Sequence, residues 1–266
     1  MIPKRIQSCA HRSEQNRSPP GAGVRFLFSL DFYSRELSVC MAEKEKEYKV
    51  RILKIEPVTH DVKRFIIEKP LDYAYTPGQA TDVSIDKDTW KDEKRPFTFT
   101  CLPNENYLEF VIKIYPEHHG VTEQLGKLSP GDTLTIREPF GTIAYKGKGI
   151  FIAGGAGITP FIAILRHLNK EGKLKGNALL FSNKTAPDII LEEELKKILG
   201  ENCYFTLTRE KHEGCDFGRI DERYLKQKVK NFKKYFYVCG PPQMVAGIKA
   251  YLQKLGAKMD TIVFEE

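Results

Sequence analysis

The stretch Ala153-Gly154-Gly155-Ala156-Gly157-Ile158-Thr159-Pro160 decides the fold, because it joins an apolar segment to an amphipathic one. Glycines at such a turn let the backbone approach a bulky anion, and free N–H groups at the start of the following helix favour a phosphate. A tight strand-to-helix connection without a ligand is the alternative. The stretch lacks the Lys-Ser/Thr ending of a P-loop, which disfavours nucleotide hydrolysis. It predicts a βα turn with a candidate phosphate site at Gly155, Gly157, Thr159 and Pro160.

Strand-like and helix-like segments alternate downstream of this turn. The expected strands are 150–153, 179–181, 204–208, 235–239 and 261–264, and the expected helices are 159–171, 191–199, 221–229 and 241–255. Strict alternation is typical of βαβ units, so we expect a five-stranded parallel Rossmann-like sheet over 146–266. In the first of these helices, Thr159 is the expected N-cap and Pro160 the first helical residue.

The upstream part, 44–145, has a different pattern. Short segments rich in Val, Ile, Thr and aromatic residues are separated by turns such as Pro77-Gly78 and Pro130-Gly131. The expected strands are 48–55, 62–68, 80–85, 97–101, 107–115 and 133–137. Six such strands predict an antiparallel β-barrel. The fold class is therefore β + α/β, a barrel followed by a parallel nucleotide-binding sheet.

The composition is that of a globular protein. Of the 266 residues, 41% are hydrophobic and 29% are charged, which is close to globular averages. The net charge of +7 comes from basic residues interleaved with acidic ones, so we expect no nucleic-acid partner. The most apolar stretch, 150–165, is interrupted by Gly and Pro and is shorter than the roughly 20 residues of a membrane span. We therefore expect no integral membrane segment.

The six cysteines, at positions 9, 40, 101, 203, 215 and 239, form no CxxC pair. Their spacing fits neither a zinc site nor a cysteine-ligated iron–sulfur cluster, so we expect no metal. Cysteines without such clustering are typical of a reducing compartment, and we expect a cytoplasmic protein.

Residues 1–40 differ from the rest of the chain. They are rich in Arg, Ser, Pro and Gly up to Val24 and show no sustained periodicity, so we expect a disordered leader or a non-native extension. An organellar transit peptide is the alternative. Met41, which precedes a charged run and then clean strand patterning, is the expected natural start.

Two further motifs carry groups suited to a nucleotide cofactor. Arg95-Pro96-Phe97-Thr98 opens a barrel strand, and it offers a guanidinium for a phosphate, a ring for stacking and a hydroxyl donor. An ordinary strand with an arginine at its edge is the alternative. Cys239-Gly240-Pro241 ends a parallel strand where a ligand would lie. A lone strand-end Cys is also a common small buried hydrophobe.

Taken in this order, the three motifs resemble those of the ferredoxin–NADP reductase family of flavoproteins, over about 45–266. The resemblance implies a barrel that holds FAD and a parallel sheet that holds NADP or NAD. It implies that Arg95 binds the FAD pyrophosphate, that Phe97 packs on the isoalloxazine and that Thr98 lies near its N5. A tyrosine is usual where Phe97 stands, so hydrogen bonding from this position is in doubt.

The resemblance extends to further cofactor residues. Lys113 and Tyr115, with Gly120, Val121 and Thr122, look like the second flavin segment, whose helix start offers N–H groups to the pyrophosphate. Next to these, His118 and His119 are interpreted as solvated loop residues, with a phosphate contact as the alternative. In the nucleotide turn, Ala156 replaces the usual Thr.

The resemblance also assigns the nicotinamide side. It places Cys239 beside the nicotinamide, followed by Gly240 and Pro241. Thr208 and Arg209 resemble the segment that grips the 2′-phosphate of NADP, which favours NADPH over NADH. The alternative is a solvent-facing arginine beside Glu210. Near the C-terminus, Glu265 matches a family glutamate, but the aromatic residue that usually follows it is absent.

The expected function is an FAD-dependent oxidoreductase with Thr98, Cys239 and Glu265 as catalytic candidates. It would transfer a hydride between NAD(P)H and FAD and pass electrons to a separate carrier such as ferredoxin or flavodoxin. One alternative is an NAD(P)H:flavin or ferric reductase with a dissociable flavin. Another is a non-catalytic flavin-binding subunit of an electron-transfer complex.

Overall fold

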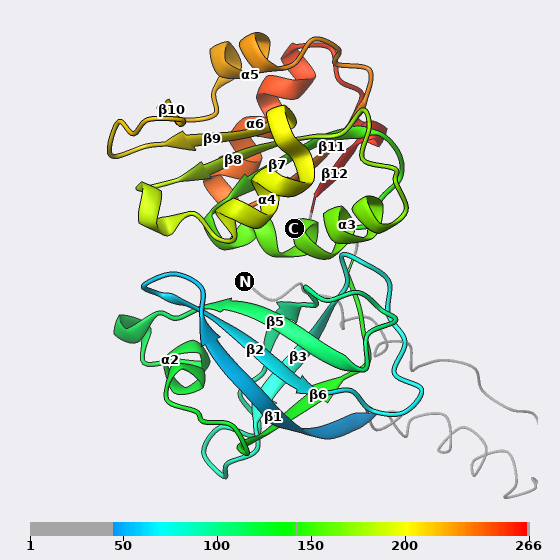
Figure 1. Cartoon of the computed structure of the whole chain (residues 1–266), viewed down its shortest axis with the longest axis vertical. Helices are drawn as coiled ribbons and strands as arrows, with labels where there is room; N and C mark the ends of the chain where they lie inside the picture. The colour runs from blue at the N-terminus through cyan, green and yellow to red at the C-terminus, as the bar shows by residue number, and fades with distance from the viewer. Residues whose placement is uncertain (1–44, 142, 265–266) are drawn as a thin grey trace, which may run out of the picture. The chain divides into compact units, whose positions relative to one another are not determined.

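The structure is a computed structural model that describes residues 45–141 and 143–264 (Figure 1). The expectations for 1–40, for Met41 and for Glu265 lie outside the described residues. Within the described part, no helix has both the length and the apolar character needed to cross a bilayer.

Six antiparallel strands form the first sheet, as the sequence predicts. They are β1 (Glu47–Pro57), β2 (Val62–Glu68), β3 (Ala80–Ile85), β4 (Arg95–Thr98), β5 (Tyr107–Lys113) and β6 (Thr133–Arg137), with helix α2 (Val121–Gly126) and the 3-10 turn η1 (Pro116–His118) between β5 and β6. The order is β4-β3-β6-β1-β2-β5. A single bridge between Phe99 and Phe110 joins the two outer strands, so the sheet curls into a nearly closed barrel.

Strand β4 differs from its prediction. The sequence predicts 97–101, whereas the strand spans Arg95–Thr98 and pairs with β3 from Val83↔Arg95 to Ala80↔Thr98. Beyond Thr98 the chain changes partner: the Thr100 N–H donates to the Glu109 carbonyl at 2.9 Å. The β propensity of the apolar residues does not reveal this change of partner from β3 to β5. The change depends on pairing between segments that are distant in sequence.

An aromatic cluster anchors the segment that follows β4. Phe99 is completely buried and stacks on Tyr75 with ring centroids 4.3 Å apart, while the Phe110 ring lies 5.3 Å away. The Tyr75 hydroxyl donates to the Cys101 carbonyl at 3.0 Å. Fully buried aromatic side chains contribute several kcal/mol each, on the order of 3 to 5 when truncated. This aromatic core fixes the backbone next to Arg95-Pro96-Phe97-Thr98, which we call the flavin-type motif.

The second sheet is parallel. Its strands are β7 (Gly149–Gly154), β8 (Ala178–Asn183), β9 (Cys203–Leu207), β10 (Asp216–Phe217), β11 (Tyr235–Cys239) and β12 (Ile262–Phe264). Helices α3 (Thr159–Lys170), α4 (Glu192–Leu199), α5 (Glu222–Lys228) and α6 (Pro242–Lys254) connect them, with short 3-10 turns η2 (Gly155–Ile158), η3 (Ala186–Asp188), η4 (Gly200–Asn202) and η5 (Met259–Thr261). The predicted five strands are present, and β10 adds a sixth at the edge. Two residues are too few to show as an apolar pattern.

The order β10-β9-β8-β7-β11-β12 creates a switch point between β7 and β11. From β7 the chain runs outward through β8, β9 and β10, and then returns to the other side of β7 as β11. Figure 1 shows helices on both faces of this sheet, which explains why β7 is buried along its whole length. Loops leaving the carboxyl ends of β7 and β11 diverge here, and ligands bind at such points.

Candidate functional site

A cavity of about 610 Å³ opens at the carboxyl end of the parallel sheet. It gathers eight of the predicted cofactor residues: Lys113, Tyr115, Gly155, Gly157, Thr208, Cys239, Gly240 and Pro241. The other lining residues are Gly154, Ala156, Ser182, Asn183, Lys184, Asp188, Ile190 and Met244. The first two predicted residues come from the barrel and the rest from the parallel sheet. The two halves of the chain therefore meet at one cavity.

The glycine turn and the Cys239 segment pack backbone against backbone. A Cβ on Gly157 would collide with the Cys239 carbonyl, and one on Gly154 with the Met244 sulfur. Gly155 has a φ of +51°, in the left-handed region. These glycines leave the turn without side chains, so a bulky ligand can approach its backbone closely.

Helix α3 starts directly behind this turn, although its cap differs from the prediction. Thr159 is not the N-cap; it is the first helical residue, and its hydroxyl donates to the Ala156 carbonyl at 3.0 Å. The reason is that the 3-10 turn η2 runs straight into α3, which makes Ile158 the N-cap. Pro160 is therefore the second helical residue and not the first, but it still lies in the first turn, where its missing N–H costs nothing.

Asn183, a lining residue that the sequence does not single out, has an unsatisfied side chain. The residue is 5% exposed, and neither its Oδ1 nor its Nδ2 has a hydrogen-bond partner. Its backbone carbonyl accepts from the N–H and the hydroxyl of Thr208, at 3.0 and 3.2 Å. An unpaired buried amide costs about 1 to 3 kcal/mol. The sequence signal that could have identified Asn183 is its position as a polar residue at the end of an apolar strand.

Arg209 lies apart from its neighbour Thr208. Thr208 lines the cavity, whereas Arg209 is exposed and is absent from the lining. The Arg209 N–H donates to the Lys184 carbonyl at 3.0 Å, and Glu210 accepts from the Ala186 N–H at 2.6 Å. The loop is thus tied to η3, with Arg209 projecting from the loop that borders the cavity. Its role toward a 2′-phosphate stays a prediction.

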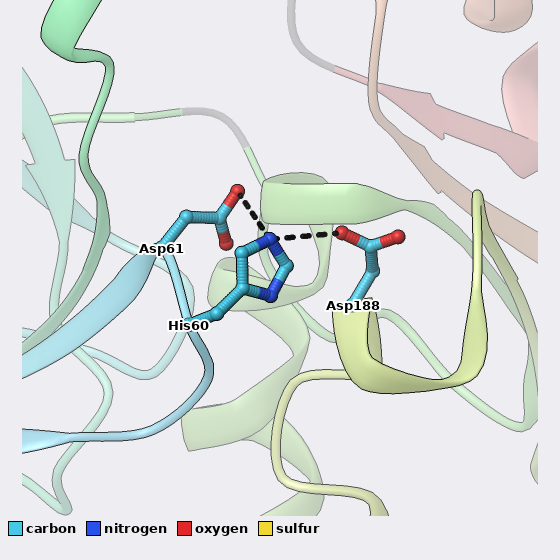
Figure 2. A group of neighbouring side chains, drawn as sticks. All are labelled: His60, Asp61 and Asp188. Carbon is cyan, nitrogen blue, oxygen red and sulfur yellow. Dashed lines mark ion pairs between the residues drawn. The ribbon is translucent and has the colours of Figure 1, made fainter.

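A charged cluster borders the cavity (Figure 2). His60 Nε2 lies 3.6 Å from Asp61 Oδ2 and 3.8 Å from Asp188 Oδ1. These three residues offer metal-type ligand atoms within 4.8 Å of one another. However, the Lys113 ammonium stands 2.6 Å from Asp61 Oδ2, and a cation so close repels a metal ion. The cluster is best interpreted as an ion-pair network between the barrel and the parallel sheet.

Asp188 is held in its ionised form by its own turn. Its Oδ2 accepts from the N–H and the hydroxyl of Thr185, at 2.8 and 2.6 Å. Partial burial by itself raises the pKa of Asp188, but these hydrogen bonds, with Lys113 and His60, outweigh burial and lower the pKa below the usual range. The cavity edge therefore carries a fixed negative charge next to a positive one.

The flavin-type motif, Arg95-Pro96-Phe97-Thr98, forms β4, and none of its residues lines this cavity. Arg95 is 51% exposed; its Nη1 donates to the Lys94 carbonyl at 2.7 Å and lies 3.7 Å from Glu93. Pro96 is exposed, whereas Phe97 and Thr98 are half-buried. The Phe97 ring centroid lies 6.3 Å from that of Phe110. The motif thus presents an accessible guanidinium beside a partly covered aromatic face.

The second flavin-type segment begins helix α2. Gly120 is its extended N-cap, Val121 is buried, and no side chain caps the N–H groups of the first turn, which includes Thr122. Helix α2 contacts β3, the strand paired with β4. Uncapped N–H groups and an exposed guanidinium, on two elements that both contact β3, are groups that can bind a phosphate. Their role toward the pyrophosphate of FAD stays a prediction. Nearby, His119 Nδ1 pairs with Glu123 at 3.3 Å.

Comparison with protein families gives two matches. Residues 49–145 match the oxidoreductase FAD-binding domain, and residues 151–250 match the oxidoreductase NAD-binding domain. The first range covers the barrel and the second covers the nucleotide turn and the Cys239 segment.

Individual proteins are similar along most of the chain. The reductase component of propane 2-monooxygenase from Rhodococcus jostii is 26% identical over 83% of this chain. The match spans only 64% of that relative's length. Human NADH-cytochrome b5 reductase 1 is 29% identical, with 84% of this chain and 87% of the relative covered. A ferredoxin NADP+ reductase structure from Neisseria gonorrhoeae superposes with a TM-score of 0.74 at 20% identity, covering 84% and 99% of the two chains, and so shows the same fold.

Proposed function

The chain belongs to the ferredoxin reductase-like family of NAD(P)H-dependent FAD oxidoreductases, and we propose that it passes electrons to a separate carrier protein. The observation that carries this proposal is the shared cavity. Barrel residues Lys113 and Tyr115 line it together with Cys239 and the glycine turn. A nicotinamide bound there would lie at the junction of the FAD-binding and NAD-binding parts.

The residues of this chain bind and orient the two cofactors. FAD, when bound, accepts a hydride and releases electrons singly or in pairs. Arg95 and the start of α2 would hold its pyrophosphate, and Phe97 would cover its ring. On the nucleotide side, the glycine turn would hold the phosphates and Cys239 would contact the nicotinamide. Thr98 and Glu265 remain catalytic candidates.

The electron acceptor is proposed to be a separate protein. The described cysteines, at 101, 203, 215 and 239, form no CxxC pair, and among the described residues the one group of three or more metal-type ligands contains no cysteine. Two of the similar proteins named above are the reductase component of propane 2-monooxygenase and an NADH-cytochrome b5 reductase. We propose a ferredoxin, a flavodoxin or a comparable small carrier as the acceptor, NADPH as the preferred donor, and the cytoplasm as the location.

The test begins with the full chain purified with its bound flavin. The flavin is identified after denaturation, and its reduction by NADPH and by NADH is followed by stopped-flow absorbance. Ferredoxin, flavodoxin and cytochrome b5 are then compared as acceptors at equal concentration. We expect bound FAD, rapid reduction and transfer to at least one carrier. Bound FAD that neither nucleotide reduces would contradict the proposal and favour a non-catalytic subunit.

A reductase with a dissociable flavin is the second candidate, and the exposure of Arg95 favours it. A guanidinium that is 51% exposed is well solvated and gains less from a phosphate than a buried one. This candidate would be supported if the protein purifies without flavin and oxidises NAD(P)H only when free FAD or FMN is added. Retention of FAD through gel filtration would contradict it.

A further inference from the structure

Arg166, in the second half of helix α3, contacts three residues outside its own helix. Its Nη1 donates to Glu109 Oε1 at 2.7 Å and to the Thr100 carbonyl at 2.8 Å. Its Nε and Nη2 donate to the two carboxylate oxygens of Glu194 at 2.6 and 2.9 Å, which is a bidentate pair. One guanidinium, 18% exposed, therefore joins α3 to α4 and to the barrel.

Glu109 is the barrel partner in this contact, and its side chain is only 5% exposed. Its Oε1 also accepts from the Thr100 hydroxyl at 2.7 Å, and its Oε2 lies 3.7 Å from Arg64 Nε. Removing one partner of a buried ion pair leaves an uncompensated charge, which is strongly unfavourable. The contact between Arg166 and Glu109 is therefore unlike an exposed ion pair, which would contribute little.

The Arg166–Glu109 contact lies close in sequence to two segments that are predicted to bind cofactors, the flavin-type strand and the glycine turn. On the barrel side, Thr100 lies two residues after Thr98, the last residue of the flavin-type strand. On the other side, α3 begins at Thr159, directly behind the glycine turn. A helix is stiff over the roughly 10 Å between Thr159 and Arg166. A displacement at Arg166 would thus be transmitted to the glycine turn.

The contact with Glu194 extends this arrangement to the cavity edge. Glu194 lies in the first turn of α4, which follows η3 and its cavity residue Asp188. Arg166 itself is absent from the cavity lining. It can therefore influence the reaction through the elements it joins, without touching the nucleotide.

We propose that Arg166 is a positioning residue for hydride transfer, holding the glycine turn and the flavin strand at the separation that transfer requires. The inference rests on the proposed function. In this transfer a C–H bond of the reduced nicotinamide breaks and an N–H bond forms at the flavin, so both electrons move with the hydride. Because a misplacement of about 1 Å can lower such a rate by two orders of magnitude, loss of the contact should act mainly on the rate.

The test uses the full chain with FAD bound and the variants Arg166→Met and Arg166→Lys. Nucleotide affinity is measured by titration with NADP+ or NAD+, and the limiting rate of flavin reduction by stopped flow. Hydrogen–deuterium exchange of β5 and α4 is measured in parallel. For Arg166→Met we expect at least a tenfold lower rate, an affinity within threefold of wild type, and faster exchange. Lysine should restore part of the rate, because it keeps the charge and loses the fork.

His167→Ala is the matched control, because His167 is the next residue of α3, has a side chain that is 42% exposed, and pairs with Glu171 at the end of its own helix, at 3.3 Å. Its rate should stay within twofold of wild type. If Arg166→Met does not fold, the same rate and affinity are measured for Glu194→Gln. This variant weakens only the pair between Arg166 and α4, so the rate should fall by less. An unchanged rate in the Arg166 variants would overturn the inference, as would a rate loss matched by loss of FAD or of nucleotide affinity. Wild-type chain that neither nucleotide reduces would overturn the proposed function as well.

Discussion

The Cys239 carbonyl occupies the space that a Cβ on Gly157 would need. These residues end β11 and follow β7, the two strands that flank the switch point. The close approach is between backbone atoms, which cannot move as the end of a flexible side chain can. The position of the glycine turn is thus coupled to that of the candidate nicotinamide contact.

Gly157→Ala should therefore damage both the turn and the site. Overpacking of a well-packed region costs about 1 to 3 kcal/mol, and the displaced backbone should weaken nucleotide binding at least tenfold. Urea unfolding and nucleotide titration measure the two effects. Gly247→Ala in α6 is the control, because a Cβ there meets only Tyr251 at 3.8 Å and alanine favours a helix. Wild-type affinity in Gly157→Ala would show that the turn does not contact the nucleotide.

The unsatisfied amide of Asn183 predicts opposite effects on stability and on binding. Asn183→Leu keeps a similar volume and removes two unpaired polar atoms, so the nucleotide-free protein should gain about 1 kcal/mol of unfolding free energy. If the nucleotide supplies the missing hydrogen bond, its affinity should fall about three- to tenfold in the same variant. Thermal unfolding without nucleotide and titration with nucleotide test these two expectations.

Asn177 provides the control for that experiment. It is also buried, but its Oδ1 accepts from the Gly149 N–H at 2.9 Å and its Nδ2 donates to the Lys173 carbonyl at 3.2 Å. Asn177→Leu should destabilise the protein. Destabilisation of both variants, with unchanged nucleotide affinity for Asn183→Leu, would mean that the Asn183 amide serves the fold alone.

The parts of the fold that depend on local pattern could be predicted from the sequence. The glycine turn, the alternation after it and the six barrel strands all follow from residue type and spacing. Six of the eight predicted cofactor residues at the cavity meet there because carboxyl ends of parallel strands share one edge, whereas Lys113 and Tyr115 reach it from the barrel. The bounds of β4 do not follow from local pattern, because the chain changes its pairing partner after Thr98.

The interactions that sequence reasoning missed depend on distant pairing. Arg166 and Glu109 are 57 residues apart, and nothing near either residue indicates the other. The unpaired state of Asn183 follows from what surrounds it in the folded chain. Such contacts are set by tertiary packing, which no local pattern encodes.

The proposed NADPH preference depends on Arg209. Arg209→Ala should raise the KM for NADPH about tenfold or more and leave that for NADH within twofold, because only NADPH carries the dianion that a guanidinium binds. Steady-state kinetics with both donors measure the ratio of the KM for NADPH to the KM for NADH. Lys211→Ala, on the same exposed loop, is the control, and it should change neither value. An unchanged ratio in Arg209→Ala would remove Arg209 from nucleotide recognition.

The Glu194 carboxylate predicts a pH-dependent contribution to stability. Burial alone raises its pKa, but the hydrogen bonds and charge of Arg166 outweigh burial and lower the pKa below its usual range. A carboxyl with a lower pKa in the folded state stabilises the protein above its unfolded pKa of about 4.3, and this contribution is lost as pH falls through the folded value. Because the side chain is 32% exposed, solvent screening reduces the effect to about 1 kcal/mol.

Glu194→Gln removes this charge and keeps a hydrogen-bond acceptor. Its unfolding free energy should be about 1 kcal/mol below wild type at pH 7, and the difference should shrink as the pH is lowered from 5 towards 3, where the wild-type carboxyl becomes protonated. Urea unfolding of both proteins at several pH values measures this difference, with Glu201→Gln, on the exposed turn η4, as the control. A difference that stays constant down to pH 3 would show that the charge of Glu194 does not stabilise the contact with Arg166.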